Sequence, residues 1–117
     1  MMATDDPKTT GDDLDAMDLM DTFKVTKLQR RTSAGGAWVR GTIGGHRFDA
    51  LVFLEHATQP DYELGDSRIS KLWLQRISDR VAVVNFDRGW DVRPTTPVAQ
   101  QIVDLLAEGL ADFIYDD

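Results

Sequence analysis

Two consecutive glycines, Gly44 and Gly45, constrain the fold of this chain more than any other feature. They separate two strand-like segments, AWVRGTI at 37–43 and HRFDALVFL at 46–54. Both loop positions of a two-residue hairpin favour a positive φ, which glycine adopts without steric cost. The sequence therefore predicts an antiparallel β-hairpin. Its second arm is expected to lie inside a sheet, because apolar residues occur on both of its faces.

Strand-like segments continue on both sides of this hairpin. Residues 22–31, TFKVTKLQRR, alternate apolar and polar side chains. Residues 67–77, SRISKLWLQRI, and 80–87, RVAVVNFD, predict a second hairpin that turns at Ser78 and Asp79. We therefore expect about five consecutive antiparallel strands, a meander.

The C-terminal segment is predicted to form one helix. Thr95 or Thr96 can act as the N-cap, and Pro97 suits the first helical position, where its missing N–H has no partner to lose. Apolar residues then recur with the 3.6-residue period of an amphipathic helix: Val98, Ile102, Leu105, Leu106, Leu110, Phe113 and Ile114. This helix is expected to cover one face of the sheet, which makes the fold class α+β.

The 117 residues are predicted to form a single domain, 22–117, after an acidic segment, 1–21. The net charge is −7, and residues 1–21 hold seven Asp and one Lys. This segment is expected to be a mobile tail, because it has too little apolar surface to order itself. The alternative is that its later part forms a short helix that docks on the body or on a partner. The apolar residues available for docking are Leu14, Met17, Leu19 and Met20.

Composition disfavours several classes of function. The chain has no Cys, which removes disulfides, thiolate nucleophiles and Cys-based zinc sites. No apolar run approaches the roughly 18 residues that a membrane span needs. The N-terminal residues also lack the basic and apolar regions of a secretory signal. A soluble, cytoplasmic protein is therefore expected.

The most distinctive stretch, NFDRGWDVRP at 85–94, is predicted to be the crossover from the last strand to the helix. Gly89 permits a sharp backbone turn, and Trp90 is expected to plug the edge between sheet and helix. Asp87 and Asp91 can act as acid and base in a hydrolase only where a substrate pocket separates their pKa values. We prefer the structural interpretation, so no catalytic residue is predicted.

Metal and cofactor sites find little support in the sequence. His46, Asp49, Glu55 and His56 lie close together along the chain. However, residues three apart on a strand face opposite sides, so His46 and Asp49 cannot share an ion without a bulge. The serines lack a Gly-x-Ser-x-Gly motif, and the glycine-rich residues 33–45 lack the ending of a phosphate-binding loop. No metal, cofactor or enzymatic activity is predicted.

Three motifs follow one another in the chain: WVRGTIGGHRFDALVF at 38–53, SRISKLWLQ at 67–75 and VVNFDRGWDVRP at 83–94. As a set they resemble a family of small uncharacterised domains from phages and other bacterial mobile elements. In that family a W-V-x-G-x-I-x-G hairpin, an I-S-K-L-W strand and a D-R-G-W-D corner occur in this order. The resemblance covers about residues 37–97 and implies mobile-element biology but no reaction.

A binding surface is predicted on the sheet face that the helix leaves uncovered. Strict alternation puts Ile69 and Trp73 on one face of their strand, opposite Leu72 and Leu74. The sheet then has more apolar residues than one helix can shield: Trp38, Leu51, Phe53, Leu72 and Leu74. Excess apolar area of this kind is typical of interfaces, including those of homodimers.

The preferred hypothesis is a non-enzymatic protein-binding module. The biology that the resemblance implies extends it to an anti-defence, anti-CRISPR-like inhibitor that occupies a nucleic-acid-handling host protein. The residues expected to contact the partner are Trp38, Arg40, Phe53, Lys71, Trp73, Asp87, Arg88, Trp90 and Asp91.

The alternative is a nucleic-acid-binding module, because cations and aromatic rings on one sheet face can bind single strands. The basic candidates are Arg40, Arg47, Arg68, Lys71, Arg76, Arg80 and Arg88. Residues 22–94 hold twelve Lys or Arg against eight Asp or Glu, an excess of only +4. A strong phosphate-binding surface is therefore not expected.

Overall fold

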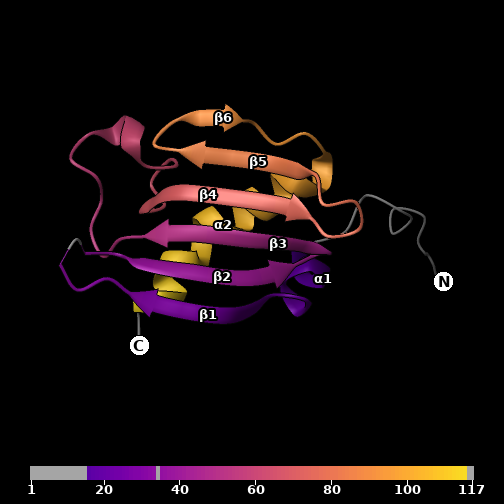
Figure 1. Cartoon of the computed structure of the whole chain (residues 1–117), viewed down its shortest axis with the longest axis horizontal. Helices are drawn as coiled ribbons and strands as arrows, with labels where there is room; N and C mark the ends of the chain where they lie inside the picture. The colour runs from indigo at the N-terminus through magenta and orange to yellow at the C-terminus, as the bar shows by residue number, and fades with distance from the viewer. Residues whose placement is uncertain (1–15, 34, 116–117) are drawn as a thin grey trace.

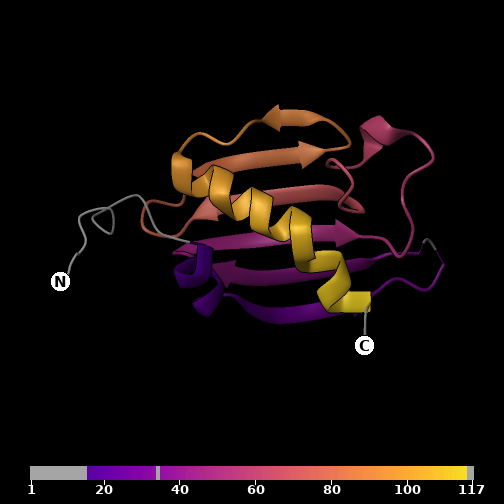
Figure 2. The ribbon, with the colours of Figure 1, turned by 180° about the vertical axis from the view of Figure 1, so that it is seen from behind.

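A computed structural model describes residues 16–33 and 35–115, in which six antiparallel strands form one sheet in the order β1-β2-β3-β4-β5-β6. One long helix, α2, crosses the sheet diagonally on one side (Figures 1 and 2). The elements are α1 (Ala16–Asp21), β1 (Lys24–Arg30), β2 (Ala37–Ile43), β3 (His46–Val52), the 3₁₀ turn η3 (Pro60–Tyr62), β4 (Ile69–Arg76), β5 (Ala82–Asp87), β6 (Trp90–Val92) and α2 (Pro97–Tyr115). The predicted α+β meander with one C-terminal helix is confirmed.

The additional strand lies within the stretch 85–94. Instead of crossing directly to the helix, the chain turns at Arg88 and Gly89, which have φ values of 54° and 147°. The N–H of Asp87 donates to the carbonyl of Gly89 over 2.8 Å. Trp90 then pairs with Phe86 in β5. The three-residue strand β6 was not predicted because so short a segment shows no alternation.

The central hairpin forms at the predicted glycines. Gly44 and Gly45 have φ values of 55° and 74°, and Ile43 pairs with His46 across the turn. Helix α1 packs on this turn, because Leu19 is fully buried and a Cβ at Gly44 would lie 2.5 Å from its side chain. The last six residues of the acidic segment 1–21 therefore form a short docked helix, which was the alternative prediction for this segment. The rest of the predicted mobile tail lies outside the described residues.

The hydrophobic core lies between α2 and the sheet face toward it. In β3, His46, Phe48, Ala50 and Val52 face α2, as alternation predicted. Thr96 is the N-cap, since its hydroxyl oxygen accepts from the N–H of Ala99 over 3.0 Å. The largest fully buried side chains are Phe48, Leu19, Ile43, Ile69, Leu72, Leu74, Ile102, Leu110, Val39, Val52, Val83 and Val84.

A bulge in β4 makes one face prediction wrong. Val52 pairs with Ile69, but Leu51 pairs with Lys71, so Ser70 is an extra residue in the ladder. One extra residue reverses the alternation beyond it. Ile69 therefore faces α2 together with Leu72 and Leu74, whereas Trp73 faces the other side.

This correction reduces the apolar excess on the uncovered face, because Leu72 and Leu74 are 1% and 0% exposed. A second correction concerns Phe113 of α2. It was predicted to lie on the buried side but is 61% exposed, and its ring contacts that of Phe23 at 5.3 Å. Among the described residues, no helix combines the length and the apolar character needed to cross a bilayer.

Candidate functional site

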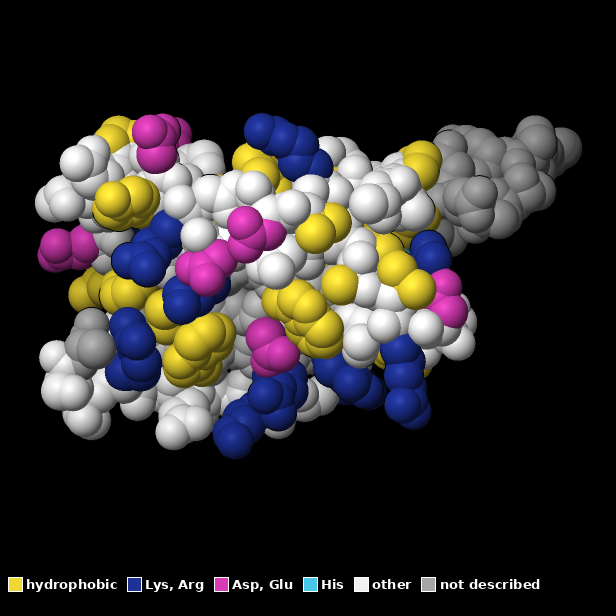
Figure 3. Space-filling model, turned by 45° about the horizontal axis from the view of Figure 1, so that its top comes forward, with side chains coloured by type: hydrophobic (Ala, Val, Ile, Leu, Met, Phe, Trp, Pro, Cys, Tyr) yellow, Lys and Arg dark blue, Asp and Glu magenta, His cyan; other side chains and the backbone are white. Residues whose placement is uncertain are grey.

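The sheet face opposite α2, called here the open face, carries a shallow groove of about 500 Å³. Its side chains come from alternate positions of β1 to β5, because alternate residues of a strand point to the same side. The polar residues and tryptophans of the groove are Lys27, Gln29, Trp38, Arg40, Asp49, Lys71, Trp73, Asn85 and Asp87. The open face is turned toward the viewer in Figure 1 and obliquely in Figure 3.

Two indole rings are the largest side chains of the groove. Trp38 stands on β2 opposite Leu51, and Trp73 stands on β4 opposite Asp49, so β3 separates the two rings. Trp38 is 37% exposed and Trp73 is partly exposed, whereas Leu51 is buried. The open face therefore presents two separate aromatic surfaces rather than a continuous apolar patch.

The charged groups of the groove are partly paired. Arg40 Nε lies 2.8 Å from Asp49 Oδ1, and this hydrogen bond raises the pKa of Arg40 above its ordinary value. Lys71 Nζ lies 3.7 Å from Asp87 Oδ1. Both carboxylates are thus engaged by neighbouring cations, and the groove offers a mixture of charges.

Three further cations stand on the open face: Lys24, Lys27 and Arg47. A bulge after Val25 brings Lys24 and Lys27 to the same side. Within the described part of the chain, none of the three has a carboxylate within 4 Å. The open face as a whole is therefore basic.

The structure brings five of the nine predicted contact residues together in the groove, namely Trp38, Arg40, Lys71, Trp73 and Asp87. The other four lie elsewhere. Phe53 and Arg88 line a second cavity of about 610 Å³ at one end of the sheet, which Lys71 also borders. Asp91 lines neither cavity, so it shares no pocket with Asp87.

Trp90 faces the helix side rather than the open face. Its ring meets that of Phe86 edge-on at 5.2 Å and packs against the core, while the guanidinium of Arg93 lies 5.3 Å from its centroid. This side chain therefore closes the edge between sheet and helix.

The histidines considered as metal ligands lie in separate places. His46 is buried, with Nδ1 2.7 Å from the carbonyl oxygen of Gly44, whereas Asp49 is on the open face. His56 lies in the β3–β4 connection, beside Glu63 and Asp66. The potential ligand atoms of these three lie within 4.8 Å of one another.

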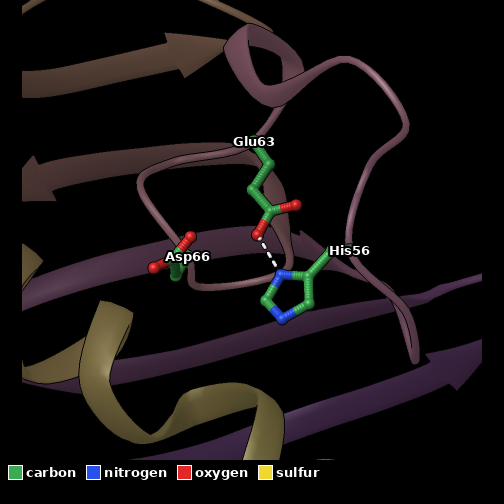
Figure 4. A group of neighbouring side chains, drawn as sticks. All are labelled: His56, Glu63 and Asp66. Carbon is green, nitrogen blue, oxygen red and sulfur yellow. Dashed lines mark hydrogen bonds and ion pairs between the residues drawn. The ribbon is translucent and has the colours of Figure 1, made fainter.

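Glu63 holds this connection together. It is 6% exposed, and its carboxylate accepts from the N–H of Ala57 (2.6 Å) and of Arg68 (3.0 Å), while His56 Nδ1 lies 2.6 Å from Oε2. Figure 4 shows the His56 ring and the Glu63 carboxylate pointing toward one another. Burial raises the pKa of Glu63, but the hydrogen bonds from His56, Ala57 and Arg68 outweigh it, so the pKa lies below its ordinary value.

Both oxygens of Glu63 are thus already occupied within the protein, which indicates a structural role in closing the loop. Sequence reasoning missed this residue, because nothing in the polar segment 55–66 distinguishes a buried acid from an exposed one. Its hydrogen-bond donors are backbone groups that only the folded loop brings together.

A family model described as a domain of unknown function, DUF7678, matches residues 37–111. The chain belongs to the DUF7678 family. This agrees with the small uncharacterised family that the sequence motifs indicated. Comparison of the chain with curated proteins and with solved structures gave no match.

The DUF7678 match extends from the start of β2 into α2, so it includes most of the groove, while Lys27 and Gln29 of β1 lie before it. Gly41, in the first motif of this region, has a clear packing role. A Cβ there would meet the backbone oxygen of Lys24 at 2.2 Å and the Phe48 ring at 2.8 Å. In this chain, glycine at this position therefore allows β1 to pair closely with β2.

Proposed function

We propose that this chain is a non-enzymatic protein-binding module that uses its open face. The observation that carries the proposal is a pair of indoles on the open face. Trp38 and Trp73 both line its shallow groove of about 500 Å³. Trp and Arg are enriched among the residues that contribute most to protein interfaces. A shallow groove also suits contact with another surface better than enclosure of a small substrate.

The charges of the groove support a protein partner. Asp49 and Asp87 lie among the cations, each paired with a neighbour at 2.8 Å and 3.7 Å respectively. Carboxylates in this position oppose a phosphate backbone, whereas mixed charges around aromatic anchors are typical of protein interfaces. Polar groups such as Gln29 and Asn85 are available for hydrogen bonds at the periphery of the contact.

The finer proposal is an anti-defence role in a bacterial host cell, with a nucleic-acid-handling protein as the partner. It rests on the resemblance of the motifs to domains of phages and mobile elements.

The test is affinity purification of the full chain from host lysate, followed by Kd measurement with the purified partner. We expect a stable complex with a nucleic-acid-handling protein. Trp38→Ala and Trp73→Ala should each weaken it by about 2 kcal/mol. Phe113→Ala is the matched control, because this aromatic residue is also exposed but lies outside the groove. Recovery of no such protein contradicts the anti-defence role, and equal loss in all three variants contradicts the open face as the surface.

A second candidate function, binding of single-stranded nucleic acid, is favoured by Lys24, Lys27 and Arg47. They share the open face with the two indoles and have no carboxylate within 4 Å among the described residues. Fluorescence anisotropy with labelled single-stranded DNA and RNA at several salt concentrations separates the two functions. A protein-binding module should show negligible affinity. A nucleic-acid binder should show an affinity that falls steeply with salt and is reduced in Lys27→Gln.

A further inference from the structure

The cavity of about 610 Å³ lies where three connections of the meander meet. Because successive strands reverse direction, the β1–β2, β3–β4 and β5–β6 connections all lie at one end of the sheet (left in Figure 1). At this end Figure 3 shows Lys and Arg side chains interspersed with hydrophobic ones and with Asp or Glu side chains. The volume is within the range of small-molecule sites, roughly 300–1,000 Å³.

Two arginines reach this cavity from different connections. The guanidinium carbon of Arg31 lies 5.6 Å from the centroid of Phe53, and that of Arg88 lies 5.8 Å from the centroid of Tyr62. Stacking on a ring orients a guanidinium while N–H groups at its edge stay available to an oxyanion. In Arg31 one of these donors, Nε, already bonds the carbonyl of Gly35 over 2.7 Å.

Neither arginine is strongly neutralised. Among the described residues, Arg31 has no carboxylate within 4 Å, and Arg88 has one contact, at 3.9 Å, with Asp87. Lys71 adds a third cation to the lining from β4, and its Nζ lies 3.7 Å from the carboxylate of the same Asp87. Two acidic residues also border the cavity, the exposed Glu55 and the buried Glu63. Backbone N–H groups and His56 already engage the oxygens of Glu63.

The backbone at this cavity is held in an uncommon conformation. Arg68 and Arg88 both line it and have φ values of 65° and 54°, a left-handed region that side chains disfavour. Hydrogen bonds maintain both: the N–H of Arg68 donates to Glu63, and that of Arg88 donates to the carbonyl of Ser70 over 3.0 Å. Glycine would adopt these angles without strain, and strained residues of this kind gather at ligand sites.

We infer that this cavity binds a small organic phosphate, held at its phosphate group by Arg31, Arg88 and Lys71. Cations from three separate segments match a group with three free oxygens and up to two negative charges better than they match a carboxylate. The apolar part of the ligand packs against Phe53 and Leu54 at the same cavity. This site is separate from the pair of indoles on the open face.

The experiment is isothermal titration of the full chain with phenyl phosphate, inorganic phosphate and benzoate. We expect phenyl phosphate to bind with one-to-one stoichiometry, more tightly than inorganic phosphate, and benzoate to bind least. Arg88→Gly removes one guanidinium and also relieves the backbone strain. It should therefore weaken phenyl phosphate binding by about tenfold to a hundredfold, while Tm stays equal or rises.

Arg80→Gly is the matched control. Arg80 also has a left-handed backbone, with φ of 61°, but it belongs to the β4–β5 connection at the other end of the sheet. Its replacement should leave phenyl phosphate binding unchanged, as should Trp38→Ala. Absence of binding to both phosphate probes, equal loss in the two glycine variants, or benzoate binding as tightly as phenyl phosphate would each overturn the inference.

Discussion

At the scale of single residues, Glu63 shows how one buried carboxylate organises a long connection. The segment between β3 and β4 has only the short turn η3 as regular structure, so its backbone N–H groups need other acceptors. The carboxylate of Glu63 accepts hydrogen bonds from the backbone N–H groups of Ala57 and Arg68 and also contacts His56. The loop wall of the second cavity is thereby held in place from within.

Replacing this carboxylate should destabilise the protein in a pH-dependent way. Because the folded-state pKa of Glu63 lies below its ordinary value of 4.5, its contribution is complete above that value and is lost as the pH falls through the lower folded pKa. Glu63→Gln should cost about 1–3 kcal/mol at neutral pH. Its deficit relative to the wild type should shrink in acid. Thermal unfolding followed by circular dichroism from pH 7 to pH 3 measures this difference.

Glu55→Gln is the control for this prediction, because Glu55 is an exposed acid in the same connection. It should leave Tm unchanged across the pH range. A Glu63→Gln protein as stable as the wild type at neutral pH would show that the carboxylate does not hold the loop.

At the scale of elements, α1 illustrates how tertiary contacts stabilise a helix too short to persist alone. Its six residues are far fewer than an isolated helix needs in water. Leu19 inserts into the core, and the hydroxyl of Thr22 bonds both the carbonyl of Leu19 and the N–H of Gly44, each over 2.7 Å. Helix α1 is therefore part of the folded body.

Leu19→Ala should destabilise the protein by about 2–5 kcal/mol, because it removes a fully buried side chain and leaves a cavity at the central hairpin. Met20→Ala is the control, because Met20 is the next residue in α1 and its side chain is exposed. This substitution should change the free energy of unfolding by less than about 0.5 kcal/mol. Urea unfolding of both variants measures the difference. Equal effects would mean that α1 does not contribute to the core.

At the scale of the whole molecule, opposite charges lie on opposite layers. The exposed side of α2 carries Asp104, Glu108 and Asp112, whereas Lys24 and Lys27 stand on the open face. The net charge of the chain is −7, but a partner that binds the open face meets a basic surface. For this reason the salt dependence of binding, rather than the isoelectric point, distinguishes a protein partner from nucleic acid.

Many residues of the candidate groove could be predicted from the alternation of side chains along single strands. Trp38 and Arg40, and likewise Lys71 and Trp73, are two residues apart and so share a face. Asp49 and Lys27 joined the groove only through pairing across strands, which sequence spacing does not reveal. The second cavity could not be predicted at all, because its residues come from three connections that are distant in the chain.

The sequence by itself determined the features whose chemistry is local. The paired glycines at 44–45 required a tight hairpin, and Thr96 with the apolar period after Pro97 required a capped amphipathic helix. Tertiary structure alone decided the bulge at Ser70, which reverses the facing of the rest of β4, and the burial of Leu19 and Glu63. These depend on non-local hydrogen bonds and packing, which neighbouring residues in the chain do not encode.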